Sequence, residues 1–197
     1  MKFKLLGSEI YISFLFVAVI SLMLATDKTG LALPTLFAVS LHEIGHLLAM
    51  WIVGTPPKSI RLIPASVQIT RSISSRYKND IIVALSGPLV NFALFLTLYI
   101  NYLIFGNEGI LYYSLINLIV GLFNLLPVTG LDGGTVLFSV IAKKRDINKA
   151  MLTLRIISLC LGAVCLFLAI TLTLRGKLNV SVYIISVYLF LSVLIKI

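Results

Sequence analysis

The sequence predicts an all-α polytopic membrane protein with about six transmembrane helices, a broken fourth helix and a short cytoplasmic-side β hairpin or edge strand. Three observations lead to this fold class: the composition, the number of apolar runs, and the placement of basic residues between those runs. Of the 197 residues, 59% are hydrophobic and only 12% are charged. Because soluble domains carry about 25% charged residues, this composition excludes an ordinary water-soluble domain.

Six apolar runs account for the predicted helices. A spanning helix needs about 20 mostly apolar residues, with a range of roughly 17–25, so the first and last runs are short. The stretch KLLGSEIYI is expected to hold a short strand ahead of the first span. In chain order, the predicted spans are Ile10–Thr26, Gly30–Val53, Ile81–Ile104, Ile110–Leu126, Ile156–Leu174 and Val180–Ile195.

The basic residues predict the orientation of these spans. Lysines and arginines gather before the first span, between the second and third, between the fourth and fifth, and at the C-terminus. With both termini in the cytoplasm, nearly all of them lie on the cytoplasmic side, as the positive-inside rule requires. The net charge of +9 therefore reflects membrane topology, and we expect the lipid bilayer as a partner and no nucleic acid.

Two segments depart from a plain series of spans. The polar segment Gly54–Asp80 contains IRLIPASVQIT, whose β-branched residues predict a hairpin or edge strand. The region Ile110–Ala142 is too long for one straight span and carries Pro127 and several glycines near its centre. Broken backbone at membrane depth is tolerated where it is buried in protein or lines a water-filled cavity, so this break indicates a site.

The sequence HEIGH lies inside the second span and holds both histidines of the chain, His42 and His46. Residues four apart share one helix face, so both imidazoles can reach one metal ion, while Glu43 points to the flank. This arrangement is typical of zinc enzymes in which two histidines bind Zn²⁺ and the glutamate acts as general base toward water. The alternative is isolated polar residues that face the interior of a helix bundle, but ionisable groups within a span are costly and usually functional.

A catalytic zinc site usually has three protein ligands, and the chain has no third histidine. Asp132, at the predicted helix break, is the favoured third ligand because the other acidic residues lie at span ends or in loops. At 1.5 Å per helical residue, His42 and Asp132 both lie about 15–18 Å from the cytoplasmic boundary. The alternatives are an Asp132 that only caps the following helix, and ligation by Cys160 or Cys165.

Three motifs, HEIGH, SGPLVN and NLLPVTGLDGG, resemble those of the site-2 protease family of intramembrane zinc metalloproteases. The resemblance covers essentially the whole chain and is strongest to the compact bacterial type, which includes a sporulation protease that processes a pro-sigma factor. It implies one Zn²⁺ per chain, held by His42, His46 and Asp132, with Glu43 as the catalytic base. It also implies a bacterial cell membrane protein that cuts membrane-embedded protein substrates.

Further site residues follow from the same resemblance. The motif G-P-x-x-N matches Gly87, Pro88 and Asn91, and its amide would polarise the scissile carbonyl or hold the substrate backbone. The alternative is that Asn91 hydrogen-bonds a neighbouring helix. Asn124 matches a position linked to presenting an extended substrate strand. Where many members have a second proline in that loop, this chain has Thr129.

The resulting expectation is a single transmembrane protease domain, residues 1–197, without a PDZ or other soluble regulatory domain. Its expected substrate is a membrane-tethered pro-sigma factor, anti-sigma factor or signal-peptide remnant, and regulation would come from the membrane core or from a membrane partner protein. The alternatives are an intramembrane metal-ion transporter and a non-catalytic pseudoprotease that binds membrane proteins. Transporters usually show repeats or polar residues along a route, whereas this chain has one polar cluster.

Overall fold

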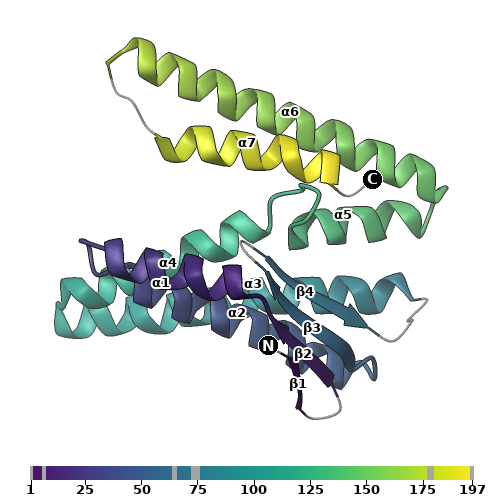
Figure 1. The fold of residues 1–197 in the computed structure, drawn as a ribbon, viewed down its shortest axis with the longest axis horizontal. Helices are drawn as coiled ribbons and strands as arrows, with labels where there is room; N and C mark the ends of the chain where they lie inside the picture. The colour runs from purple at the N-terminus through teal and green to yellow at the C-terminus, as the bar shows by residue number, and fades with distance from the viewer. Residues whose placement is uncertain (1, 6–7, 64–65, 72–75, 177–179, 196–197) are drawn as a thin grey trace. The chain divides into compact units, whose positions relative to one another are not determined.

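The computed structural model describes residues 2–5, 8–63, 66–71, 76–176 and 180–195 (Figure 1). It divides into two compact units, Met1–Phe123 and Asn124–Ile197. The strands are β1 (Lys2–Leu5), β2 (Ser8–Ile12), β3 (Pro57–Ile63) and β4 (Ser66–Arg71). The helices are α1 (Phe14–Thr26), α2 (Ala32–Ile52), α3 (Tyr77–Phe105), α4 (Glu108–Asn124), α5 (Asp132–Ala142), α6 (Ile147–Leu174) and α7 (Val180–Ile195).

The sheet belongs to the first unit and has the strand order β1-β2-β3-β4. The predicted hairpin is confirmed as the antiparallel pair β3–β4, with Ile60 opposite Ile69, and its placement on the cytoplasmic side stays a prediction; residues 64–65 lie outside the described residues. The strand expected near the N-terminus is present as the antiparallel pair β1–β2. β2 and β3 run parallel, and the chain between them forms α1 and α2, the long crossover that a parallel pair requires (Figure 1).

The predicted first span, Ile10–Thr26, begins too early. Its first residues belong to β2, which ends at Ile12, and α1 starts only at Phe14. A short apolar run fits a strand or a helix equally well by periodicity alone. Here pairing with β3 decides the outcome, since it satisfies the backbone groups of Glu9 to Ile12 in a parallel ladder.

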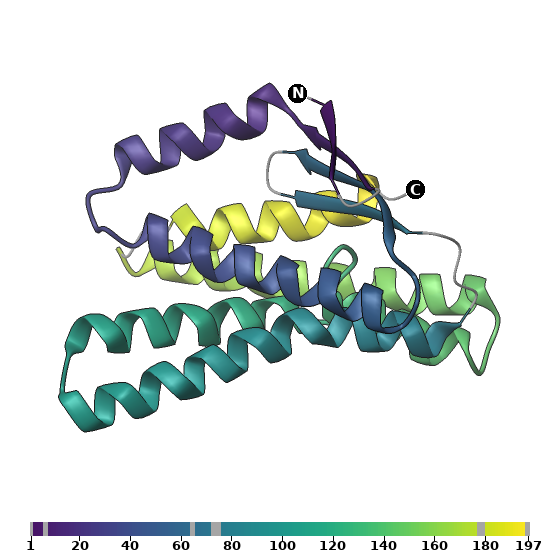
Figure 2. The same cartoon turned by 90° about the horizontal axis from the view of Figure 1, so that it is seen from below.

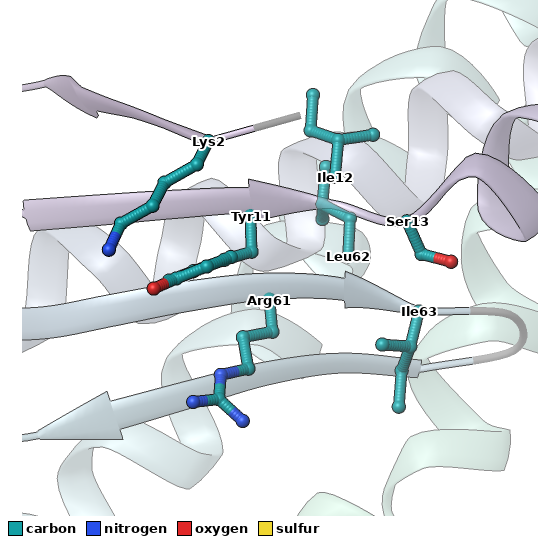
Figure 3. Close-up of a pocket in the computed structure, with 7 residues that line it drawn as sticks. All are labelled: Lys2, Tyr11, Ile12, Ser13, Arg61, Leu62 and Ile63. Atoms are coloured by element: carbon teal, nitrogen blue, oxygen red, sulfur yellow. The ribbon is translucent and has the colours of Figure 1, made fainter.

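One face of the sheet carries a shallow concavity of about 340 Å³ beside the start of α1 (Figure 3). The ring of Tyr11 lies 4.9 Å from the ammonium of Lys2 and 5.4 Å from the guanidinium of Arg61. These cation–π contacts join side chains from β1, β2 and β3, and so support the three-strand register. A hydrogen bond with Tyr11 and, second, the charge of Glu9 raise the pKa of Lys2.

The turn between α1 and α2 is closed by Asp27. Its Oδ1 accepts hydrogen bonds from the main-chain N–H of Thr29 at 2.8 Å and the hydroxyl of Thr29 at 2.7 Å. Its Oδ2 accepts from the N–H of Ala32 at 2.9 Å, the first residue of α2. The Thr29 hydroxyl and these N–H groups hold the pKa of Asp27 below its usual value, so the carboxylate fixes the start of the helix that carries HEIGH.

Helices α2 and α3 pack closely in the first unit. A Cβ added at Gly45 would lie 2.9 Å from the carbonyl oxygen of Ser86, so the glycine allows the two backbones to approach. Ala49, Met50 and Val83 form a buried apolar cluster at the same interface. α3 ends at Phe105 and is followed by Gly106, with φ 68°, after which α4 returns antiparallel to it (Figure 2). Small residues at such interfaces are typical of membrane helix packing.

Three helices of the described residues are long and apolar enough to cross a membrane: α2, α3 and α6. The other apolar helices are shorter, so the structure does not confirm the count of six. The predicted break in the fourth apolar region is confirmed, because α4 ends at Asn124 and α5 begins at Asp132. The structure is therefore mainly helical with a small sheet.

The second unit is built on α6. A Cβ added at Gly162 would meet Leu189 and Phe190 of α7 at 3.4 Å, an ordinary packing distance. The hydroxyls of Thr173 and Tyr183 join the same two helices at 3.0 Å. α5 packs on the other end of α6, which positions the loop before α5.

Candidate metal centre

The two histidines lie one turn apart on α2 and are both buried, with exposed fractions of 3% for His42 and 7% for His46. Their rings meet edge to face, with centroids 4.7 Å apart. The Nε2 atoms of the two rings face each other at 3.1 Å. The i, i+4 spacing predicted from the sequence therefore brings two imidazole nitrogens to one point.

His42 is oriented by Asn91 of α3. The Nδ1 of His42 lies 2.6 Å from the Oδ1 of Asn91, and Asn91 is completely buried. The Nδ2 of Asn91 donates to the carbonyl oxygen of Ala38 at 3.2 Å and to the Oδ1 of Asn117 at 3.1 Å. Asn91 thus bonds neighbouring helices. Both of its amide hydrogens are used in this arrangement, so polarising a substrate carbonyl would require one of those bonds to break.

His46 is oriented by the main chain. Its Nδ1 lies 2.7 Å from the carbonyl oxygen of Val83, and the hydroxyl of Ser86 donates to the same oxygen at 2.6 Å. The next carbonyl, that of Ala84, lacks its usual helical donor because Pro88 has no N–H. Residues of the SGPLVN motif therefore lie beside both histidines: Asn91 contacts His42, and Ser86 shares the Val83 carbonyl with His46.

These bonds determine which ring nitrogens carry hydrogen. A carbonyl oxygen can only accept, so the Nδ1 of His42 and of His46 each carry hydrogen, and Nε2 is in each ring the atom that can bind a metal. The two Nε2 atoms lie 3.1 Å apart. Two nitrogens bound tetrahedrally to zinc at about 2.0–2.1 Å would be separated by about 3.3 Å. The pair therefore fits a zinc ion.

Gly87 leaves the space that such an ion needs. A Cβ added there would lie 2.6 Å from the Nε2 of His42 and equally close to the Nε2 of His46. Any other residue would fill the position beside both nitrogens. The sequence prediction placed Gly87 in the site through the resemblance, and the structure gives the steric reason for a glycine.

Glu43 is half-buried on α2, between the two histidines in sequence. Successive helical residues are about 100° apart, so its carboxylate leaves the helix on the flank of the histidine face. This is the placement that the HEIGH motif predicts for a base, and the general-base role itself stays a prediction.

Asp132 belongs to the second unit, where it is the first residue of α5 and half-buried. The cap position is Leu131, so Asp132 is not the helix cap that the alternative interpretation required. A carboxylate in the first turn is stabilised by the helix dipole. Asn124, the last residue of α4, is also half-buried, and its role with substrate stays a prediction.

The loop before Asp132 is shaped by two glycines. A Cβ at Gly133 would collide with the carbonyl oxygen of Leu125, and one at Gly134 with that of Val128. The first turn of α5 thus lies directly against the loop backbone. The repeated glycine of LDGG is required by this close approach.

Ser158 of α6 anchors the same loop and was not predicted from the sequence. Its hydroxyl donates to the carbonyl of Leu154 at 2.8 Å and accepts from the N–H of Thr129 at 2.9 Å. The Thr129 hydroxyl lies 3.2 Å away and completes the contact. A proline at position 129 would have no N–H to donate. Asn117 is the other residue that sequence reasoning missed, because no motif contains it.

Three comparisons relate the chain to known proteins. The profile described as peptidase family M50 matches residues 108–169. A zinc metalloprotease of Methanocaldococcus jannaschii is 29% identical over 95% of this chain and 57% of its own length. Stage IV sporulation protein FB of Bacillus subtilis is 26% identical over 87% of this chain and 60% of its own length. This chain therefore spans somewhat more than half the length of these two relatives.

A solved structure supports the same relationship. The site-2 protease from Methanocaldococcus jannaschii matches with a TM-score of 0.72 and 25% sequence identity. The match covers 98% of this chain and 93% of that one. The shared fold, the matching profile and the sequence similarity along nearly the whole chain agree with one another: this chain is similar to the site-2 proteases of peptidase family M50.

Proposed function

We propose that this chain is an intramembrane zinc endopeptidase, which hydrolyses a peptide bond in or near a transmembrane segment of a membrane-tethered protein. The observation that carries this proposal is the buried histidine pair on α2, whose Nε2 atoms converge at 3.1 Å beside Gly87. Glu43, the expected base, stands between the two histidines in the same helix.

The proposed zinc ligands are His42, His46 and Asp132. Together these side chains offer two imidazole nitrogens and one carboxylate oxygen, a donor set typical of catalytic zinc. Such a set leaves one coordination position open. A zinc ion held by these residues would lower the pKa of a water molecule and would polarise the scissile carbonyl.

The residues of the chain perform the remaining steps. Glu43 takes the proton from the attacking water and passes it to the leaving amine. Asn91 keeps His42 in place, and Gly87 keeps the ligand position open. Asn124 and Pro88 are proposed to help present the substrate, as the family resemblance implies.

The substrate must be extended at the cut, because a helical peptide bond is shielded by its own hydrogen bonds. A strand added to the sheet would provide that geometry. The sequence predicted a hairpin or edge strand over Ile60–Thr70, and in the structure β3 lies inside the sheet, with β2 and β4 on either side. The proposed receiving strand is therefore β4. β4 is an outer strand of the described sheet.

We also propose six membrane crossings with both termini in the cytoplasm of a bacterial cell, and residues 1–197 as one membrane protease domain. β2 precedes α1, and β3 follows α2, yet the two strands pair in one sheet. The chain must therefore return to the side from which it started, which supports paired crossings by α1 and α2. The basic residues of Gly54–Asp80 support the proposal that this side is cytoplasmic.

The proposed substrates are a pro-sigma factor, an anti-sigma factor or a signal-peptide remnant, with a membrane protein as regulator. The similarity to a sporulation protein of Bacillus subtilis supports the first of these. Cleavage would release a product toward the cytoplasm, where the sheet and the basic loops are proposed to lie.

The test is Glu43→Gln, co-expressed with a membrane-tethered candidate substrate. Cleavage is expected to fall about 10²- to 10⁴-fold, because the amide cannot accept a proton, whereas bound zinc is expected to stay at the wild-type level. Glu108→Gln, which changes an exposed acid in the first turn of α4, is the matched control. Undiminished cleavage by the Glu43 variant would refute the proposal.

A further inference from the structure

Asn117 of α4 is connected to His42 by two successive hydrogen bonds, through Asn91. It belongs to none of the sequence motifs that predicted the metal site. It is buried, with 6% of its surface exposed. Its Nδ2 donates to the carbonyl oxygen of Tyr113 at 2.9 Å, one turn earlier in α4. Its Oδ1 accepts from the Nδ2 of Asn91 at 3.1 Å. The amide therefore has one fixed orientation, with its oxygen toward α3.

This orientation determines that of Asn91. A carboxamide can turn over and exchange its oxygen and nitrogen at little steric cost, so its direction depends on its partners. With Asn117 and Ala38 both offering acceptors, the nitrogen of Asn91 must face them, and its oxygen must face His42. Without the acceptor of Asn117, only the Ala38 carbonyl would oppose the reversed orientation.

The orientation of Asn91 in turn fixes the hydrogen of His42 on Nδ1 and leaves the lone pair on Nε2. If Asn91 turned over, its nitrogen would face Nδ1, and the favoured tautomer would carry the hydrogen on Nε2, where a metal must bind. His46 has no such dependence, because its acceptor is the main-chain carbonyl of Val83. The two ligands therefore differ in how their tautomers are maintained.

We propose that Asn117 is a positioning residue for the metal site: through Asn91 it holds His42 in the tautomer that presents Nε2 to zinc. This inference rests on the proposed function for the identity of the ion. The side chains of Asn117, Asn91 and His42 connect α4, α3 and α2 through two hydrogen bonds. The affinity of His42 for zinc therefore depends on a residue of α4 that does not itself bind the metal. Hydrogen-bond partners of this kind typically change metal affinity about 10- to 100-fold.

The experiment measures zinc affinity of the purified full chain by competition with a chromophoric chelator. Asn117→Ser removes the acceptor for Asn91, and its hydroxyl can bond the Tyr113 carbonyl within α4, so the helix remains satisfied. We expect zinc affinity to fall about 10-fold or more in Asn117→Ser and in Asn91→Ala. The double variant is expected to be no weaker than Asn91→Ala alone, since Asn117 acts through Asn91.

Two further variants separate positioning from packing. In Asn117→Asp, the carboxyl is expected to be neutral in this apolar interior, so that its hydroxyl can donate to Tyr113 and its carbonyl can accept from Asn91. This variant should retain wild-type zinc affinity and the wild-type visible spectrum of the cobalt-substituted protein. Ser114→Ala removes another buried polar side chain of α4, bonded only locally to Leu111, and should also leave both readouts unchanged.

The outcomes are distinct. If the wild type binds zinc and Asn117→Ser binds it equally well, the inference is wrong and the proposed function stands. Additive losses in the double variant would also overturn the inference, because Asn117 would then act by another route. If the wild type binds no zinc, the proposed function fails and the inference fails with it.

Discussion

The histidine half of the proposed zinc site and its aspartate half are held in place by different means. On α2, the imidazoles are oriented by hydrogen bonds to Asn91 and to the Val83 carbonyl, within a buried interface of three helices. At the start of α5, Asp132 is placed by the shape of the backbone, which two glycines allow to fold tightly. The orientation of the two imidazoles depends on polar partners. The position of Asp132 depends on two glycines, which have no side chain to keep the backbone segments apart.

This difference implies that the same substitution should damage the two halves in different ways. Adding one methyl group to Gly87 meets imidazole rings, which are side chains that can rotate away. Adding it to Gly133 meets main-chain carbonyls, which cannot move without reshaping the loop. Glycine-to-alanine variants therefore test the comparison directly.

The largest effect is expected for Gly133→Ala. The collision with the Leu125 carbonyl should destabilise the protein by about 3 kcal/mol, because overpacking against backbone finds little relief. Thermal unfolding in detergent and the yield of monodisperse protein measure this loss. Gly162→Ala is the control: its Cβ would meet α7 at an ordinary 3.4 Å. Equal stability of the two variants would contradict the proposed role of backbone shape.

Gly87→Ala should leave the fold intact and remove the metal. The new methyl group occupies the space beside both Nε2 atoms, at 2.6 Å, and the rings must turn to avoid it. We expect zinc affinity to fall by at least about 100-fold with little change in unfolding temperature. Gly109→Ala, where the nearest atom is the side-chain oxygen of Asn107 at 3.1 Å, is the matched control. Zinc binding at the wild-type level would show that the space beside the histidines is not used.

The smallest effect is expected for Ser158→Ala. The change removes the acceptor for the N–H of Thr129 and should cost about 1 kcal/mol, the usual net value of one hydrogen bond. Faster exchange of the Thr129 amide hydrogen would report a looser loop. Ser186→Ala is the control, since this equally buried serine of α7 bonds the Val182 carbonyl of its own helix. If Ser158→Ala and Ser186→Ala had the same effect on stability and on the exchange of the Thr129 amide, the proposed anchoring of the loop by Ser158 would be contradicted.

The sequence identified the residues with unusual chemistry and the places where helices break. The HEIGH motif placed both histidines on one face because helical geometry is local, and the structure bears out that spacing. The break between α4 and α5 followed from Pro127 and its neighbouring glycines, which are local signals as well. The β3–β4 hairpin was predicted for the same reason.

The remaining features depend on contacts between distant segments. The strand β2 was assigned in part to the first span, because an apolar run does not reveal that Ile10 pairs with Ile60. Asn117 carries no signal of its own, since a single asparagine in an apolar helix gains meaning only when Asn91 lies opposite. Ser158 is similar: its partner, Thr129, lies in another element. Long-range pairing of this kind cannot be read from local periodicity.

The parallel pairing of β2 with β3 has a consequence for the order in which the protein is assembled. Glu9 finds its partner, Ser59, only after all of α1 and α2 has been synthesised. The N-terminal strands must therefore wait while the helix that carries both histidines is made and inserted. Because loop closure over such a distance delays pairing, the sheet is completed late, and a completed sheet marks a molecule in which α1 and α2 have already been made.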